Sequence, residues 1–227
     1  MKKPAALFIT VSILLLTACS GKAVSGGNIR SSSAAVQPEK AASVQKMASS
    51  TAVKAKVKVH ESSDPRVIKL YVAASNFYTK HDYTSAVRKC DAAIAIDPLC
   101  YEAINIKGAA QYYATGDPQQ GLPLINRCIA LNPYYQYGYF NKALIYKGEK
   151  NWPVSIGLFN KVISLNPKNA WAYYGISTIY ADRNMVPQSL AYLKKAIAID
   201  PSVKATARVQ DHYDRMRSNK DFQKIVK

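Results

Sequence analysis

The feature that most constrains this chain is a short phrase ending in proline, which recurs at a nearly constant interval. The prolines are Pro98, Pro133, Pro167 and Pro201, spaced 35, 34 and 34 residues apart. The phrases read Ala-Ile-Ala-Ile-Asp-Pro, Cys-Ile-Ala-Leu-Asn-Pro, Val-Ile-Ser-Leu-Asn-Pro and again Ala-Ile-Ala-Ile-Asp-Pro. A period near 34 is typical of stacked helix-turn-helix units, because one helix pair cannot bury its apolar face without a neighbour. We therefore expect an all-α solenoid that holds another protein.

Residue size supports this frame when each proline is taken as position 32 of a unit. Positions 8 and 20 are small, which lets the two helices of a unit (helix A, then helix B) approach closely, and positions 11 and 24 are mostly large. The small residues are Ala74, Ala109, Ala143 and Ser177 at position 8, and Ala86, Gly121, Ser155 and Ser189 at position 20. The residues at position 11 are Phe77, Tyr112, Tyr146 and Tyr180, and those at position 24 are Cys90, Ile125, Phe159 and Leu193.

Turn residues fall between the two helices of each unit. Asp82, Asp117, Asn151 and Asn184 precede the second helix, with proline in three of its four first turns, and both features are start signals. Unit two carries one extra residue around 99–101, and Asn105 replaces its usual large residue at position 4. We expect a local distortion between units one and two.

The alternation of small, aromatic and proline residues resembles the tetratricopeptide repeat (TPR) over residues 66–201. The resemblance implies a right-handed superhelical solenoid in domain 64–201, built from units 67–100, 101–135, 136–169 and 170–203. The stretch 203–217 continues as one amphipathic helix, and we expect segment 202–227 to cap the last unit. Its inner side would carry Val203, Ala207, Val209, His212, Tyr213 and Met216, with Phe222, Ile225 and Val226 as a final apolar clip.

The N-terminus reads as an export signal. Lys2 and Lys3 precede an apolar run, residues 5–16, that is short for a membrane span. The following Leu-Thr-Ala-Cys resembles the bacterial lipoprotein signal, which implies that residues 1–18 are removed and that Cys19 is lipidated (palmitate among its acyl chains). Ser20 then implies the outer membrane of a Gram-negative cell, on the periplasmic side. The alternative is an ordinary cleaved signal and a free soluble protein.

The composition of residues 20–63 differs from that of the repeats that follow. Residues 20–63 have no aromatic residue and little apolar surface, so we expect 19–63 to be a lipidated Cys followed by a disordered tether. The net charge of +17 is spread along the chain without a nucleic-acid motif, so we expect no nucleic-acid partner. Positive charge of this kind favours anionic lipid or acidic envelope partners, or serves solubility alone.

No residue pattern predicts catalysis, a cofactor or a metal, so we expect no enzyme. His60, His81 and His212 have no second ligand at metal spacing, and no glycine-rich phosphate loop is present. Cys90 and Cys128 fall at helix-seam positions typical of buried thiols. The alternative is a Cys100–Cys128 disulfide, which an oxidising compartment would preserve.

The TPR resemblance implies that positions 2, 5, 9 and 12 of each first helix line the concave inner face. Seven aromatic residues fall there, more than solubility favours, and exposed apolar patches usually bind partners. The predicted groove residues are Tyr71, Tyr78, Ile106, Tyr113, Tyr137, Phe140, Trp171 and Tyr174. The Lys and Asn clamp that some TPR proteins use for a peptide carboxylate is absent, with Lys107 and Asn141 its nearest equivalents. The alternative is that tight curvature or the tether covers these rings.

These expectations combine into a lipid-anchored, periplasm-facing TPR scaffold that binds an envelope protein or peptide segment, similar in architecture to pilotin-type lipoproteins. Two alternatives stay open. One is a structural envelope protein whose basic tether and tail contact peptidoglycan or anionic lipid. The other is a non-catalytic accessory subunit of an envelope enzyme. The sequence does not predict the oligomeric state.

Overall fold

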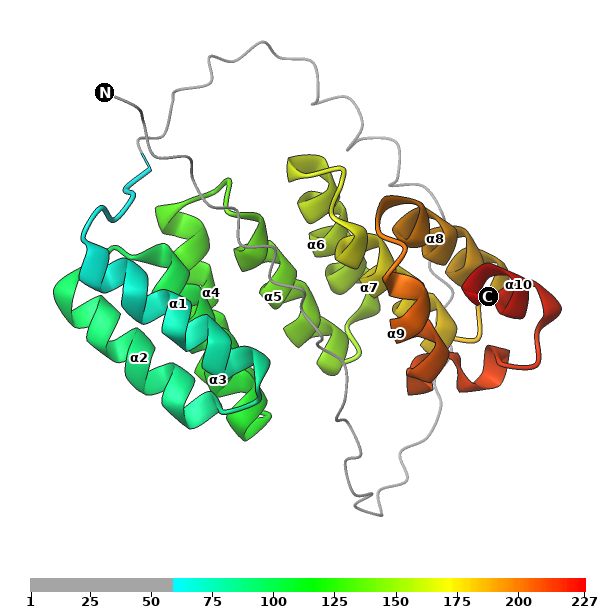
Figure 1. Ribbon diagram of the computed structural model, residues 1–227, viewed down its shortest axis with the longest axis horizontal. Helices are drawn as coiled ribbons and strands as arrows, with labels where there is room; N and C mark the ends of the chain where they lie inside the picture. The colour runs from blue at the N-terminus through cyan, green and yellow to red at the C-terminus, as the bar shows by residue number, and fades with distance from the viewer. Residues whose placement is uncertain (1–58) are drawn as a thin grey trace, which may run out of the picture. The chain divides into compact units, whose positions relative to one another are not determined.

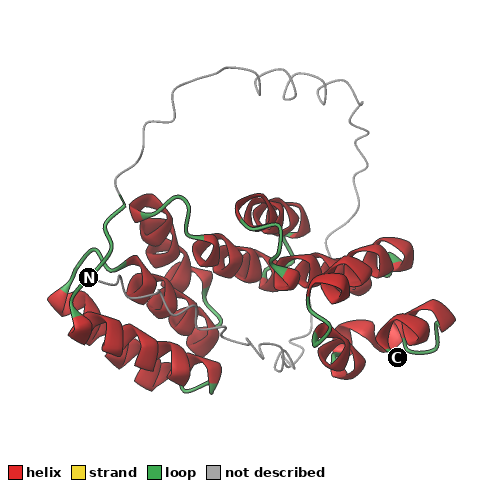
Figure 2. Cartoon of the chain, turned by 45° about the horizontal axis from the view of Figure 1, so that its top comes forward, coloured by secondary structure: helices red, strands yellow, loops and turns green. Residues whose placement is uncertain are grey.

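A computed structural model describes residues 59–227, and within that range all regular structure is helical (Figure 1, Figure 2). Eight helices form four pairs: α1 Pro65–Thr79 with α2 Tyr83–Ile96, α3 Tyr101–Thr115 with α4 Pro118–Leu131, α5 Gln136–Gly148 with α6 Trp152–Leu165, and α7 Ala170–Asp182 with α8 Val186–Ile199. Three short elements follow: α9 Val203–Val209, the 3₁₀ helix η1 Asp211–Met216 and α10 Lys220–Val226. The expected signal peptide, the lipidated Cys19 and the tether up to residue 58 lie outside the described residues.

The pairs are stacked in chain order, as the solenoid prediction requires. Each A helix (α1, α3, α5, α7) packs on its own B helix (α2, α4, α6, α8), and each B helix packs on the A helix of the next unit. The A helices also contact one another from unit to unit, α1 with α3, α3 with α5 and α5 with α7. The A helices therefore form the inner layer of the stack, and the predicted all-α solenoid of four helix pairs is confirmed.

The seam between paired helices is built from the small residues that the sequence places there. The side chains at positions 8, 20 and 24 of all four units are buried. In unit three, the Ser155 hydroxyl donates to the Ala143 carbonyl at 2.8 Å, so a buried polar group is satisfied across the seam. In unit two the backbones approach so closely that a Cβ at Gly121 would lie 2.8 Å from the Gly108 carbonyl oxygen.

The recurrent Asp-Pro and Asn-Pro phrases form the turns between units (inter-unit turns). In each turn the Asp or Asn side chain accepts a hydrogen bond from the backbone N–H two residues later, at 2.9–3.1 Å. Its carbonyl accepts a second bond from the N–H three residues later. These side chains are Asp97, Asn132, Asn166 and Asp200. Proline fits between them because it needs no N–H donor, which explains the period of the sequence.

The expected distortion between units one and two is not found. The turn from Asp97 to the start of α3 has the same length and the same hydrogen bonds as the two turns that follow it. The extra residue is taken up inside α3, which runs 15 residues from Tyr101 to the left-handed Gly116, against 14 for the equivalent stretches in α5 and α7. Asn105 is buried there and accepts a bond from the Asn141 amide at 3.1 Å, so the unusual polar residue is paired.

The turns within units place one residue each in the left-handed region. His81, Gly116, Lys150 and Asn184 occupy the same position of successive units, with φ between 56° and 72°. Three of these turns end helix A with the paired hydrogen bonds of a Schellman motif. Asn184 therefore ends α7, and the prediction that it caps α8 is wrong. Asp82 and Asp117 do accept capping bonds, from Ser85 and Gln119, whereas Asn151 makes none through its side chain.

The left-handed positions give a paired test of backbone strain. We expect Lys150→Gly to raise the free energy of unfolding by about 1 kcal/mol, because lysine is strained at a positive φ and its side chain is exposed. Gly116→Ala should lower it by about 1 kcal/mol at the equivalent place, where a Cβ would meet nothing within 4 Å. Urea unfolding followed by circular dichroism measures both. Equal signs for the two variants would contradict the strain argument.

The C-terminal segment differs from the single helix expected over 203–217. The chain is extended at Gln210 (φ −80°, ψ 133°), which ends α9 and sends η1 back toward α7. Val209, expected on the inner side, is the most exposed large apolar residue of the described chain. Tyr213, Met216, Phe222 and Val226 are buried as expected, together with Leu193 and Ala207, so the segment does cover the last unit.

Candidate protein-interaction face

The predicted groove residues lie on the inner layer, but their exposure differs from one to the next. Tyr71, Ile106, Tyr113 and Trp171 are half-buried, and Tyr137 is exposed. We call the surface around Tyr71, Ile106, Tyr113 and Leu144 the inner face; it is formed by α1, α3 and α5. Its side chains are supported from below by the buried seam and keep part of their apolar surface in contact with solvent.

An aromatic cluster closes the inner face near the turns within units one and two. The Tyr78 and Tyr113 rings lie 6.1 Å apart, and Tyr83 from α2 stacks on Tyr113 at 5.9 Å. Burial raises the pKa of the Tyr78 phenol well above its usual value. The expectation that Tyr78 is free for a partner is wrong, because Tyr83 and Tyr113 cover its ring.

Two other predicted groove residues belong to the core. Phe140 is buried and packs edge-on against Phe159 of α6, with ring centroids 5.5 Å apart. Tyr174 is only 1% exposed and lies between Trp171 and Tyr213. Their assignment to an open groove is therefore wrong: Phe140 fills the seam of its own unit, and Tyr174 is covered by η1.

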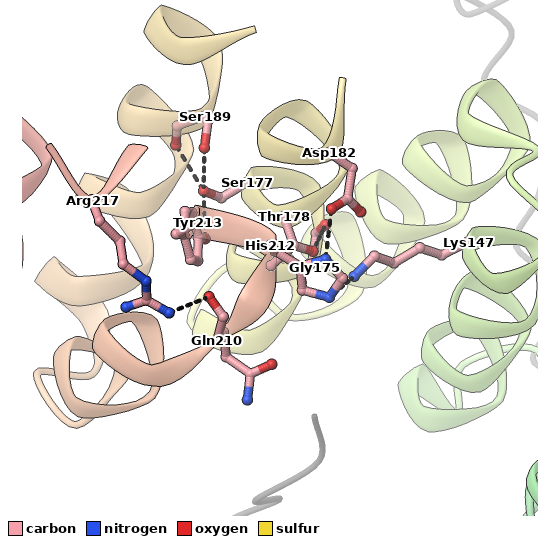
Figure 3. A network of polar contacts seen from close by, with 10 residues as sticks. All are labelled: Lys147, Gly175, Ser177, Thr178, Asp182, Ser189, Gln210, His212, Tyr213 and Arg217. Carbon is pink, nitrogen blue, oxygen red and sulfur yellow. Dashed lines mark hydrogen bonds and ion pairs between the residues drawn. The ribbon is translucent and has the colours of Figure 1, made fainter. Parts of the chain in front are cut away.

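Tyr213 fixes the C-terminal segment on α7 (Figure 3). Its hydroxyl lies 2.9 Å from the Ser177 hydroxyl, and Ser177 in turn donates to the Ser189 carbonyl at 2.8 Å. The Tyr213 ring stacks on Phe222 of α10 at 5.2 Å. Ser177 and Ser189 are the small residues at positions 8 and 20 of unit four, so the tyrosine reaches the opening between α7 and α8.

His212 joins three helices beside this anchor (Figure 3). Its Nδ1 lies 2.6 Å from Asp182 Oδ1 on α7, and its Nε2 lies 3.0 Å from Lys147 Nζ on α5. A neutral ring that donates from Nδ1 and accepts the lysine N–H at Nε2 satisfies both contacts. Lys147, which occupies position 12 of unit three, is buried beside this contact. The C-terminal segment thus occupies the inner layer at unit four.

The polar side chains that most resemble a carboxylate clamp, Lys107 and Asn141, already have partners within the protein. Lys107 forms an ion pair with Asp91 at 2.6 Å, and Asn141 donates to Asn105. The inner face of α1, α3 and α5 therefore presents aromatic and aliphatic surface, which suits an apolar segment better than an acidic chain end.

The histidines are placed in separate contacts. His60 lies 2.8 Å from Asp97, and His81 lies 2.8 Å from the Tyr83 hydroxyl. Over residues 59–227, no group of three or more His, Cys, Asp or Glu side chains is arranged to hold a metal ion. In the same range, no helix combines the length and apolar character needed to cross a membrane.

The described cysteines are free thiols, and all three are buried. Cys90 and Cys128 lie at the seam as predicted, and Cys100 precedes α3 with its thiol 3.6 Å from Glu102. The structure contains no Cys100–Cys128 disulfide. Burial raises the pKa of each thiol to about 12.

Thiol burial predicts a loss of stability in alkali. In the unfolded chain these thiols ionise near pH 9, whereas in the folded chain they hold their protons until about pH 12. Their contribution to stability is complete below pH 9 and declines as the pH rises from 9 to 12. We expect the urea midpoint to fall between pH 8 and about pH 10.5, and less steeply in Cys90→Ala. If the urea midpoint fell equally steeply with pH in both proteins, the loss of stability would be assigned to the buried tyrosines instead.

Comparison with known proteins agrees with this architecture. No protein-family model matches the chain, and no curated protein sequence matches it. Among solved structures, the chain is similar to TTC0263, a thermophilic TPR protein of Thermus thermophilus, with TM-score 0.59 and 18% identity over 70% of this chain and 86% of that one. It is similar to PilF of Pseudomonas aeruginosa with TM-score 0.58 and 11% identity, covering 70% and 73%. For MamA of Desulfovibrio magneticus RS-1 the values are 0.51 and 15%, covering 72% and 91%. At these identities the likeness concerns the fold alone, and the described chain has a TPR-like fold.

Proposed function

We propose that this protein is a lipid-anchored scaffold, held at the periplasmic face of the outer membrane through Cys19, that binds an apolar segment of an envelope protein on the inner face of α1, α3 and α5. The observation that carries the proposal is the unequal cover of the inner layer. The layer is covered at α7 by the protein's own C-terminal segment, while Tyr71, Ile106 and Tyr113 keep solvent-accessible apolar surface.

The chemistry of this face supports a protein partner. Tyrosine supplies a large apolar ring with few rotatable bonds and a polar end, and it is favoured at the centres of interfaces. A helix or extended segment laid along α1, α3 and α5 would bury apolar surface that now meets water. The acyl anchor would raise the local concentration of the scaffold near envelope proteins, so a modest affinity suffices. The likeness to PilF supports only the fold of this proposal.

Site-specific photo-crosslinking in intact cells tests the binding face. A benzoylphenylalanine at Tyr71 or Leu144 on the inner layer should give a crosslink to a defined envelope protein. The matched controls are Ala92 and Asn160, exposed residues of the B helices α2 and α6. The proposal predicts crosslinks from the first pair and not from the second. Crosslinks only from the B helices would place the partner on the outer layer and overturn the proposal.

A further inference from the structure

Exposed apolar residues are gathered at one end of the helix pairs. Eight large apolar side chains are exposed in the described chain: Ile68, Ile96, Leu99, Tyr134, Tyr137, Val154, Ile199 and Val209. Five of them lie in the inter-unit turns or in the helix turns that flank them, and Ile68 lies in the first turn of α1, at the equivalent place of unit one. Of the eight, only Val154 lies beside a turn within a unit. The opposite end of the pairs instead carries Lys80, His81, Thr115, Gly116, Glu149, Lys150, Arg183 and Asn184. The described stack therefore exposes most of its large apolar residues at one edge and Val154 alone at the opposite, more polar edge.

Four of these five residues lie in or beside two neighbouring inter-unit turns. We call Ile96, Leu99, Tyr134 and Tyr137 the turn edge; Tyr134 is 55% exposed and Leu99 is 43% exposed. The first turn is joined to α4, the helix that leads into the second turn, since an Arg127 side-chain N–H donates to the Pro98 carbonyl at 2.8 Å.

Packing behind the turn edge holds the two turns in place. Tyr101 and Tyr135 pack edge-on behind the turns with ring centroids 4.9 Å apart, and Tyr137 lies 5.5 Å from Tyr135. The turn edge is thus a supported surface rather than four isolated side chains.

The N-terminal part of the chain joins the domain at this same edge. Val59 packs against the buried cluster of Tyr101, Ile104 and Cys128, and His60 Nε2 lies 2.8 Å from Asp97 in the first inter-unit turn. Cys19 stands 40 residues before Val59 in the sequence. The chain that leads from the proposed anchor at Cys19 therefore enters the domain at the edge on which its apolar residues are exposed.

We propose that the turn edge is a membrane-contact surface, which rests on the bilayer interface when the protein is anchored. This inference rests on the lipid anchor of the proposed function. Tyrosine and aliphatic residues suit the interface, where an apolar body meets the acyl region and a polar end stays hydrated. With the turn edge on the bilayer, the A and B helices stand away from it, and the inner face stays open to a partner in the periplasm.

Charge separates this contact from binding through the basic tail or tether. Around the turn edge, basic and acidic groups nearly cancel: Asp64 pairs with Arg66, Asp97 contacts His60, and Arg127, Glu61 and Glu102 lie beside the first turn. Apolar insertion of a nearly neutral surface is expected to persist on zwitterionic lipid and in high salt. Attraction of lysines to anionic lipid would be lost in salt.

The test uses the full lipidated chain, reconstituted into phosphatidylcholine vesicles with and without lipids brominated along their acyl chains. Tyr134→Trp adds a fluorophore to the turn edge, and Glu149→Trp adds one to the opposite, polar edge. The parent protein supplies the background from Trp152 and Trp171. We expect the tryptophan at 134 to lose roughly half of its fluorescence to the brominated lipid, with no change in 1 M salt, and the tryptophan at 149 to lose none. Adding Leu99→Ser to Tyr134→Trp should reduce the quenching.

The possible results distinguish a failure of the lipid anchor from a failure of the membrane contact. Vesicle flotation reports the anchor separately, so a chain that fails to float would end both the lipid anchor and this inference. A chain that floats without quenching at 134 would overturn the membrane contact alone. Equal quenching at 134 and 149, or quenching abolished by salt, would also overturn it. No quenching in vesicles together with a crosslink from position 134 to a protein in cells would assign the turn edge to a protein partner.

Discussion

Tyr213→Ala is expected to lower the free energy of unfolding by about 4 kcal/mol and to release the C-terminal segment from α7. Tyr213 is fully buried, stacks on Phe222 and lies 6.0 Å from Tyr174, so its removal leaves a cavity at the centre of the last cluster. The hydroxyl of Ser177 also loses the contact that it shares with the phenol. Because the segment is held mainly through this ring, we expect α10 to detach before the helix pairs unfold.

The measurement combines urea unfolding with acrylamide quenching of Trp171, whose ring lies 5.5 Å from Tyr174. In the variant, quenching should rise under native conditions, because Tyr174 and Trp171 lose their cover. Tyr213→Phe is the matched control: it keeps the ring and removes only the hydroxyl, so it should cost about 1 kcal/mol and leave quenching unchanged. If Tyr213→Ala were no more costly than Tyr213→Phe, the segment would be held elsewhere.

Gly121→Ala is expected to destabilise unit two by about 3 kcal/mol, although it adds a single methyl group. A Cβ at this position would lie 2.8 Å from the Gly108 carbonyl oxygen and 2.9 Å from Tyr112 Cβ. The nearest of these atoms is backbone, so the contact is relieved only by separating α3 from α4. The separation would also loosen Ile125 and Ile145, which are buried with Tyr112 in the same cluster.

Gly157→Ala provides the matched control for Gly121. Gly157 lies inside α6, on its exposed side, and a Cβ there would meet nothing within 4 Å. Alanine is favoured over glycine in a helix, so this variant should gain about 1 kcal/mol. Thermal unfolding by circular dichroism should therefore shift in opposite directions for two identical substitutions. A similar shift for both would mean that α3 and α4 have room at Gly121 that the structure does not show.

The repeat could be predicted because its determinants are local or recur at fixed separation. The Asp-Pro and Asn-Pro turns are formed by hydrogen bonds within four residues, so each turn can be predicted from its local sequence. The small residues at positions 8 and 20 mark places where the two helices of a unit approach closely. Because four units share the same register, the helix assignment is supported four times over by separate parts of the sequence.

The binding face could be predicted only in part. Position 5 belongs to helix A in every unit, yet Tyr71 keeps solvent exposure while Tyr174 has lost it. The difference arises because the covering residue, Tyr213, comes from the C-terminal segment, and the break at Gln210 that redirects this segment carries no glycine or proline signal. The sequence indicated that Phe222, Ile225 and Val226 help to cap the last unit, but not that η1 would cover Tyr174 on the inner layer.

The sequence by itself determined the helical units, their register, the turns that join them and the seam that holds each pair, because each depends on neighbours a few residues away or one period apart. Only the tertiary structure decided which rings stay exposed, which end of the stack is apolar, and where the tail lies. Those properties depend on contacts between segments with no fixed separation in the chain, such as His212 with Lys147 and Tyr213 with Ser177. Their free energy comes from burial that exists only once the units are stacked.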